Sequence, residues 1–410
     1  MRNRSGLAIS RRTLLGNAAL AGLALSASPA GAAQKMVDLL LPGRPGQREY
    51  SDKFPQKGTM IVQRTRPPLL ETPIEVFDKD VFTPNKSFFV RWHWAQIPTE
   101  INPEPFRLNI HGLVNTPASL SLKDIIALPQ FRIAAVNQCS GNSRGFCEPP
   151  VPGAQWANGA MGNARWTGVR LRDVLDRAGI ARGALQVRFK GMDEALVPGA
   201  PGFMKSLSLE HARDGEVMIA YAMNGEQLPL LNGFPLRLVV PGWYSTYWVK
   251  MLNDIELLGA LDDNFWMAKA YTIPDTPHAD MVPSQAGVKM VPINRMVPRS
   301  FVTNINAGMR IPAGKRVLAR GIAFGGDTGV AQVEVSIDGG KSWHMATLGP
   351  DEGKYSLRRW TTYISLSQKG DHALLVRCTN DKGEVQPDTP NWNPSGFMRN
   401  AIEATNIIAV

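Results

Sequence analysis

The sequence predicts an α+β domain followed by an all-β immunoglobulin-like sandwich, and three observations support this division. Between about residues 82 and 258, apolar stretches with strand-like and helix-like spacing follow one another. Between residues 273 and 298, prolines recur every few positions, which removes backbone donors and interrupts regular elements. Beyond that segment, apolar and polar residues alternate as they do in half-buried strands. A chain of 410 residues also suggests more than one hydrophobic core.

Local patterns predict the elements of the first domain in order. One helix is indicated by apolar residues at helical spacing, namely Leu171, Val174, Leu175 and Ala178. Gly179 directly afterwards is a natural residue to end that helix. Residues 217–221 and 236–240 are apolar runs typical of buried strands, and Asn224-Gly225 between them favours a tight turn.

The second domain is predicted from strict alternation. Residues 332–337 alternate polar and apolar side chains, and the turn sequence at 338–340 (DGG) then sends the chain back toward Trp343. Residues 373–378 belong to another stretch of this kind. Together these stretches fit a sandwich of about 110 residues.

The first residues of the chain have the features of an export signal. Arg11 and Arg12 precede an alanine- and leucine-rich stretch, which ends in small residues. The adjacent arginines favour the twin-arginine route into the periplasm, with cleavage near Ala32; a short membrane anchor is the alternative. Because that route carries folded proteins, it hints at a cofactor inserted before export. Residues 33–69 are then expected to form an extended segment leading to the first domain.

Charge and cysteine content restrict the possible functions. Loss of residues 1–32, which carry four arginines and no acid, would lower the net charge from +10 to +6. A mildly basic surface suits anions, but no block of lysine and arginine indicates a nucleic-acid partner. No run of about 20 apolar residues that could span a membrane follows the N-terminal stretch. No Cys-x-x-Cys-His motif is present, so the chain is expected to hold no c-type haem.

Cys139 lies in the most unusual segment of the chain. It follows the apolar run 133–136 and begins a loop of small and amide residues that also contains Arg144. Backbone N–H groups and an arginine can stabilise a thiolate there, and a soft anionic sulfur suits a thiophilic metal. A buried free cysteine, the commonest fate of a lone cysteine, is the alternative interpretation.

Several motifs, in order, resemble those of the sulfite oxidase family of molybdopterin enzymes. The segment 138–144 (QCSGNSR) is similar to the Q-C-[AS]-G-N-x-R signature of that family. The further similar segments are 82–93 (FTPNKSFFVRWH), 159–171 (GAMGNARWTGVRL), 224–242 (NGEQLPLLNGFPLRLVVPG), 248–250 (WVK), 335–343 (VSIDGGKSW) and 386–393 (QPDTPNWN). The resemblance covers roughly residues 70–408, and it rests on the ordered set rather than on any single motif.

The resemblance implies roles for five residues near the reaction centre. Cys139 would be the protein ligand to molybdenum, whose other sulfurs come from the pterin dithiolene. Arg91 would face the substrate oxyanion and Arg144 would add a second positive charge, since a guanidinium fork suits oxyanions. Tyr271 would be the active-site tyrosine, and Trp156 would line the substrate pocket. From the residues alone, surface ion pairs for the arginines and core packing for the two aromatic residues remain alternatives.

The resemblance also implies contacts to the pterin. His93, Arg237 and Lys250 stand where the family places such contacts, and Asp193 is a weaker candidate. Asn232 departs from the vertebrate pattern, in which a histidine precedes Gly-Phe-Pro; an amide can still donate and accept, so it is kept as a cofactor-binding residue. A second departure is at 325–329 (GGDTG), where animal members carry an arginine near the substrate channel.

The expected function is that of a periplasmic sulfite dehydrogenase. The resemblance implies a catalytic domain over residues 70–285 and an immunoglobulin-like dimerisation domain over 286–410, commonly a homodimer. A haem-binding domain has no room before residue 70, so electrons are expected to pass to a separate c-type cytochrome. Two alternatives remain: a molybdopterin reductase acting on another oxo-anion or a sulfoxide, and a non-catalytic exported scaffold.

Overall fold

The computed structural model describes residues 35–410. The predicted export signal and its cleavage site near Ala32 lie outside the described residues. In the part of the chain that is described, we find no helix with the length and apolar character needed to cross a bilayer.

The N-terminal part of the described chain forms an antiparallel sheet that reaches the candidate site. Its strands follow one another in chain order: β1 (Met36–Asp38), β2 (Gln47–Ser51), β3 (Met60–Arg64), β4 (Leu69–Glu71) and β5 (Val90–Arg91). Leu69 in β4 pairs with Arg91 in β5. The segment predicted to be extended therefore contains three strands of the sheet that carries Arg91.

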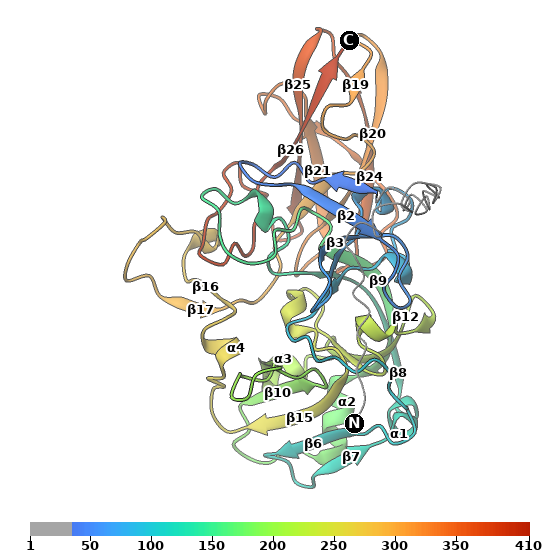
Figure 1. Ribbon diagram of the computed structural model, residues 1–410, viewed down its shortest axis with the longest axis vertical. Helices are drawn as coiled ribbons and strands as arrows, with labels where there is room; N and C mark the ends of the chain where they lie inside the picture. Colours follow the sequence, from blue (N-terminus) through green and yellow to red (C-terminus); the bar gives the residue numbers. More distant parts are fainter. Residues whose placement is uncertain (1–34) are drawn as a thin grey trace, which may run out of the picture. The chain divides into compact units, whose positions relative to one another are not determined.

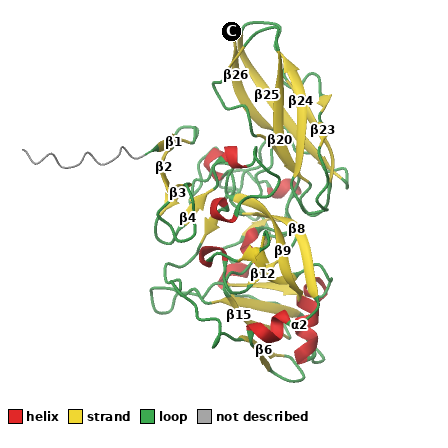
Figure 2. Cartoon of the chain, turned by 90° about the vertical axis from the view of Figure 1, so that its right-hand side faces the viewer, coloured by secondary structure: helices red, strands yellow, loops and turns green. Residues whose placement is uncertain are grey.

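A second sheet ends at Cys139. Its strand order is β13 (Glu226–Gln227), β12 (Met218–Met223), β9 (Met161–Arg170) and β8 (Gln130–Gln138), and β14 (Arg237–Val239) also pairs with β12. Strands β8 and β9 pair along their whole length, from Gln130 opposite Val169 to Gln138 opposite Met161. Figure 2 shows β8, β9 and β12 side by side. The predicted strands at 217–221 and 236–240 are confirmed, as is the turn at Asn224-Gly225, where both residues have positive φ.

A third sheet completes the first domain. Its strand order is β11 (Met204–Ser208), β10 (Gln186–Gly191), β15 (Leu252–Leu258), β6 (Leu108–Gly112) and β7 (Ala118–Leu120). Helices in the described chain are short: α1 (Leu122–Ile126), α2 (Leu171–Ala178), α3 (Leu209–Ala212) and α4 (Phe265–Ala268). The predicted helix at 171–178 is α2, and Gly179 at φ 66° ends it by donating its N–H to Leu175 O.

The proline-rich segment contains a small pair of strands, β16 (Thr272–Pro274) and β17 (Met290–Pro292), and the predicted sandwich follows it (Figure 1). One sheet of the sandwich consists of β18 (Arg299–Val302), β20 (Arg316–Phe324), β24 (Arg358–Ser365) and β23 (Thr347–Leu348). The other consists of β19 (Arg310–Ile311), β26 (Glu403–Ala409), β25 (Gly370–Asn380), β21 (Val330–Ser336) and β22 (His344–Met345). The predicted turn at Gly339-Gly340 joins β21 to β22, and both glycines have positive φ.

The main hydrophobic core continues from the first domain into the sandwich. It includes Phe324, Leu357 and Phe397 together with the strands around Cys139. Main-chain bonds also cross this boundary, because Val136 N donates to Tyr355 O at 2.8 Å. The end of β8 is therefore held by β9 of the first domain and by Tyr355 of the sandwich.

Candidate active site

Cys139 begins a loop that hydrogen bonds hold against the segment preceding β9. The Cys139 N–H donates to Ala160 O at 2.9 Å, and its carbonyl accepts from Asn142 N at 3.0 Å. The Asn142 side chain donates to Gln138 Oε1 and Asn158 O and accepts from Ala160 N. Asparagine suits this position because one amide group can satisfy several main-chain donors and acceptors. The Cys139 side chain, 5% exposed, is thus placed at the end of a rigid strand.

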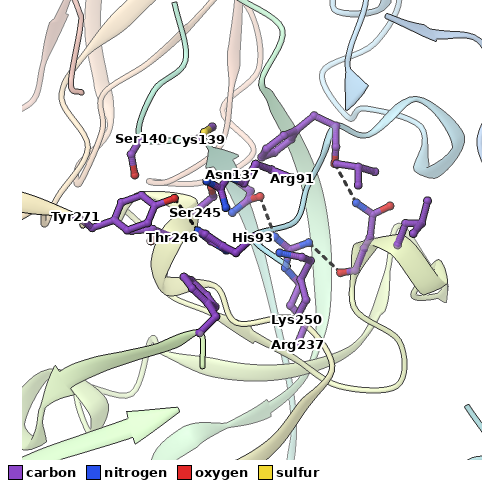
Figure 3. A pocket seen from close by; sticks show the side chains of 15 residues that line it. Arg91, His93, Asn137, Cys139, Ser140, Arg237, Ser245, Thr246, Lys250 and Tyr271 are labelled. Atoms are coloured by element: carbon purple, nitrogen blue, oxygen red, sulfur yellow. Dashed lines mark hydrogen bonds between the residues drawn. The ribbon is translucent and has the colours of Figure 1, made fainter. Parts of the chain in front are cut away.

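A cavity lies against Cys139 (Figure 3), and its empty space of about 420 Å³ includes a part that is open to solvent. It is lined by Phe89, Val90, Arg91, His93, Asn137, Cys139, Ser140, Phe203, Leu231, Asn232, Arg237, Ser245, Thr246, Lys250 and Tyr271. Seven of the ten predicted site residues are in this lining. The lining is part apolar and part polar; none of these lining residues is acidic and three are arginine or lysine, so the polar part of the wall is cationic.

Three predicted cations, Arg91, Arg237 and Lys250, face the cavity. Arg237 donates to Asn232 O and to Asn137 Oδ1, both at 2.9 Å, and burial lowers its pKa to about 9. Lys250 lies 4.4 Å from the centre of the Trp92 ring, and burial, reinforced by the nearby Arg237, lowers its pKa to about 7. Burial is the main cause of both shifts, and for Lys250 the nearby Asp193 acts in the opposite direction without cancelling it.

His93 and Tyr271 form a pair at one side of the cavity. The His93 Nε2 and the Tyr271 hydroxyl lie 2.7 Å apart, and the imidazole stacks on Phe203 with ring centres 3.6 Å apart. Burial, followed by the charge of Arg91, lowers the pKa of His93 well below its usual value, so the ring is neutral near pH 7. Burial also raises the pKa of Tyr271, which keeps the phenol protonated.

Three predicted residues do not line the cavity. Arg144 lies behind the Cys139 loop, where its guanidinium donates to Ser395 O at 2.8 Å and to Ala154 O at 3.3 Å. Trp156 is a fully buried core residue, 1% exposed. Asp193 is buried, which raises the pKa of its carboxyl, while the charge of Lys250 acts in the opposite direction. The structure therefore places these residues around the site rather than at its surface.

Asn232 lines the cavity, but its side chain is committed to protein partners. Its Oδ1 accepts from the Lys57 ammonium, and its Nδ2 donates to Phe89 O at 3.1 Å. Lys57 also donates to Asn85 O and Phe88 O, so all three of its N–H groups are used. Each end of the amide thus has one protein partner, and one N–H and one acceptor site of the oxygen are left for a ligand.

Sequence reasoning missed several lining residues. Asn137 and Ser140 flank the predicted cysteine, and their place in the same motif was a signal that they belong to the site. Ser245 and Thr246 reach the cavity from the turn before Lys250, and no local pattern identified them.

Unsatisfied donors show what the cavity can hold. Within the described structure, the atoms that are buried without a hydrogen-bond partner include Arg91 Nη1, His93 Nδ1, Asn137 Nδ2, Ser140 Oγ and Arg237 Nε. Buried polar groups of this kind require partners, and most of these atoms are donors. The donor set fits a polar, anionic cofactor, and the adjacent thiol fits a thiophilic metal. No group of three or more His, Cys, Asp or Glu side chains arranged for a metal was found over residues 35–410.

Comparisons with known proteins agree with this chemistry. The family model described as oxidoreductase molybdopterin binding domain matches residues 94–266, and that described as Mo-co oxidoreductase dimerisation domain matches 291–409. Mitochondrial sulfite oxidase of Macaca fascicularis is 33% identical over 374 residues, which are 86% of this chain and 66% of that protein. The enzyme of Rattus norvegicus is 31% identical over 395 residues, 91% of this chain and 70% of that protein.

A solved structure has the same fold. The sulfane dehydrogenase SoxCD from Paracoccus pantotrophus matches with a TM-score of 0.72 at 24% identity, over 96% of this chain and 95% of that chain. The match to the two mammalian enzymes extends over about two thirds of their length, 66% and 70%.

Proposed function

Because this chain belongs to the sulfite oxidase family of molybdopterin enzymes, we propose that it oxidises sulfite to sulfate at a molybdenum centre ligated by Cys139. One observation carries the proposal: a single cavity brings the Cys139 thiol together with Arg91, Arg237 and Lys250 and with donors that lack protein partners.

The cavity residues divide between cofactor and substrate. Arg237, Lys250 and the unsatisfied donor of Asn137 would hold the pterin and its phosphate, since charge-assisted hydrogen bonds are the strongest available to an anion. The Cys139 thiolate would ligate the metal, and the molybdenum-pterin group supplies the two-electron, oxygen-transfer chemistry that amino-acid side chains lack.

Arg91 is the residue suited to the substrate. Near neutral pH sulfite exchanges with bisulfite and carries one or two negative charges, and a planar guanidinium binds such an oxyanion through two parallel hydrogen bonds. Since Arg91 Nη1 has no partner in the described structure, this donor is available without breaking an internal bond. Because Arg91 is half-buried, its attraction for an anion is screened less than it would be on an open surface.

Tyr271 and His93 can donate and accept a proton during the reaction. The phenol is protonated and the imidazole neutral near pH 7, so the Tyr271 O–H can donate to an oxygen in the cavity or to His93 Nε2 at 2.7 Å. Arg144 adds positive charge from behind the loop.

The proposal extends to location and partners. The N-terminal arginine pair supports export to the periplasm by the twin-arginine route, a c-type cytochrome is proposed to accept the electrons, and the sandwich is proposed to form a homodimer. Exchange of both Arg11 and Arg12 for lysine should retain the protein in the cytoplasm; unchanged export would contradict that route.

Purified full-length protein tests the activity. Molybdenum is quantified per chain, and sulfite-dependent reduction of ferricyanide and of a c-type cytochrome is measured. We expect about one molybdenum per chain and turnover with both acceptors. Bound molybdenum without sulfite turnover would refute the substrate, and absence of molybdenum would refute the cofactor.

A further inference from the structure

Phe397, which belongs to the C-terminal part of the chain, contacts two residues of the candidate site. Its ring stacks on the Tyr271 ring with centres 5.3 Å apart and an interplanar angle of 1°. The Arg144 guanidinium carbon lies 5.2 Å from the centre of the same Phe397 ring. The side chain is buried at 5% exposure, so both contacts are made away from water.

The main chain around Phe397 is held firmly. Its carbonyl accepts from Asn391 Nδ2 at 3.0 Å and from Asn393 Nδ2 at 2.9 Å, and its N–H donates to Asn393 Oδ1 at 3.0 Å. Two asparagines from the 386–393 motif therefore fix this one residue. Because its main chain is anchored in this way, the Phe397 ring can determine the position of the more flexible side chains that contact it.

The residues on either side of Phe397 are anchored to the Cys139 loop. The Met398 N–H donates to Ser140 O at 3.1 Å, and Ser395 O accepts from the Arg144 guanidinium at 2.8 Å. Gly396 has φ 57°, and a Cβ at this position would lie 2.8 Å from Arg144 Cγ. Any residue larger than glycine at position 396 would therefore collide with Arg144.

We propose that Phe397 is a positioning residue of the active site, through which the C-terminal domain sets the orientation of Tyr271 and Arg144. The kinetic part of this inference rests on the proposed sulfite oxidation. Arg144 is buried, and the charged or ionisable groups that act on it most are Cys139, Tyr271, Arg91 and Cys147, none of them a carboxylate. The aromatic face and two carbonyls therefore stabilise its charge, since a cation is attracted to a ring face. For Tyr271, offset stacking restricts the ring while its hydroxyl meets His93.

Three variants separate positioning from general stability. Phe397→Leu removes the aromatic face but keeps an apolar side chain, and Phe397→Tyr keeps the face. Phe106→Leu is the matched control, because Phe106 is a core phenylalanine of similar exposure, 6%, in the same hydrophobic cluster. Molybdenum content, melting temperature, and kcat and KM for sulfite are measured for each.

We expect Phe397→Leu to raise KM and lower kcat, for a fall in kcat/KM of about tenfold, with molybdenum content unchanged. Phe397→Tyr should restore most of this loss. Phe106→Leu should lower the melting temperature to a similar degree but leave kcat and KM as in the wild type. Wild-type kinetics in Phe397→Leu, or the same kinetic loss in Phe106→Leu, would overturn the inference.

The crystal structure of Phe397→Leu decides the positioning without any reference to substrate. We expect the Tyr271 ring and the Arg144 guanidinium to leave their wild-type positions. Side chains that stay in place would overturn the inference even if sulfite is turned over. If the wild-type enzyme instead lacks sulfite turnover, the proposed function fails while displaced side chains still support the positioning role.

Discussion

At the scale of single residues, the site is defined by one buried and two half-buried cations, and the nearest carboxylate, Asp193, lies outside the cavity lining. Arg91, Arg237 and Lys250 converge on one cavity whose described lining contains no carboxylate. Isolated buried charges are costly, so a fold keeps them where a ligand supplies the opposite charge. Their convergence distinguishes this cavity from ordinary packing defects.

Arg91→Met should weaken sulfite binding without removing the cofactor. Loss of a charge-assisted hydrogen bond of about 1.5–3 kcal/mol corresponds to a fall in kcat/KM of about 10- to 100-fold, mainly through KM. Steady-state kinetics with molybdenum content measured in parallel provide the readout. Arg170→Met, which removes an arginine that lies over Phe131, is the control and should leave KM unchanged. An unaltered KM in Arg91→Met would contradict the role of Arg91.

The lowered pKa of Lys205 predicts how the free energy of unfolding changes with pH. Lys205 is fully buried beneath Tyr271, and desolvation lowers its pKa to about 7 from 10.5. Between pH 7 and pH 10.5 the unfolded chain therefore binds a proton that the folded chain has lost, so stability rises with pH in this window.

In Lys205→Met, the increase in the free energy of unfolding with pH should be smaller than in the wild type by about 1.4 kcal/mol per pH unit. Urea unfolding at pH 7.5, 8.5 and 9.5 measures the slope for both proteins. Equal slopes would show that Lys205 keeps its proton in the fold.

The cysteine and its charged neighbours could be predicted from sequence because they lie within ordered motifs. Asn232 shows what that reasoning leaves out. Its oxygen accepts from Lys57, which is 175 residues away in the chain, and no local spacing reveals a partner at that separation. Phe397 was missed for the same reason, since its stacking on Tyr271 depends on tertiary packing.

At the scale of elements, the Cys139 loop is held in place by β4 as well as by β8. Glu71 at the end of β4 accepts from Gly159 N at 2.8 Å, from Ala157 N at 3.3 Å and from Gln63 Nε2 at 2.7 Å. The segment it holds in turn binds the Cys139 loop, since Ala157 O accepts from Ser143 N at 2.8 Å. One carboxylate thus links the N-terminal sheet to the cysteine.

Gly159→Ala should therefore disturb the cysteine loop. A Cβ at Gly159 would lie 1.9 Å from Thr72 O and 2.8 Å from Glu71 Cγ, so main chain must move. We expect a loss of about 1–3 kcal/mol in stability together with reduced molybdenum content. Gly202→Ala is the control, because its nearest neighbour is the end of the Lys190 side chain at 3.9 Å. Unchanged molybdenum content in Gly159→Ala would show that the segment around Gly159 does not influence the metal site.

Regular elements were predicted well where periodicity or turn chemistry is local. Helix α2 ends at Gly179 and the hairpin turns at Asn224-Gly225, as their sequences indicate. Strands β1 to β3 were expected to be an extended leader, because short strands in a polar, proline-punctuated segment give no clear alternation. Antiparallel pairing of each strand with the next, from β1 through β4, rather than local preference, determines them.

At the scale of the whole described chain, the two domains share a core and polar bridges. Arg320 of the sandwich donates to both oxygens of Asp78, at 3.0 and 2.6 Å, and Thr303 donates to the same carboxylate. The continuous core through Tyr355 and Phe397 adds apolar contact. The division into domains was visible in the sequence, but the extent of this shared boundary was not, because it joins residues more than 200 positions apart.

We expect the two domains to unfold together. Scanning calorimetry should show one transition rather than two, because the main core crosses the domain boundary, even though the sandwich also has a core cluster of its own. Asp78→Ala should move this single transition to lower temperature without splitting it. Two well-resolved transitions in the wild type would contradict a shared core.

The central claim is that Cys139 holds the molybdenum at which sulfite is oxidised. Sulfite-dependent reduction of ferricyanide, measured for the wild type, Cys139→Ser and Cys147→Ala with molybdenum quantified in each, tests it most directly. Turnover should be abolished in Cys139→Ser with the fold intact and should persist in Cys147→Ala. Full activity in Cys139→Ser would contradict the ligand assignment and, with it, the account of the site.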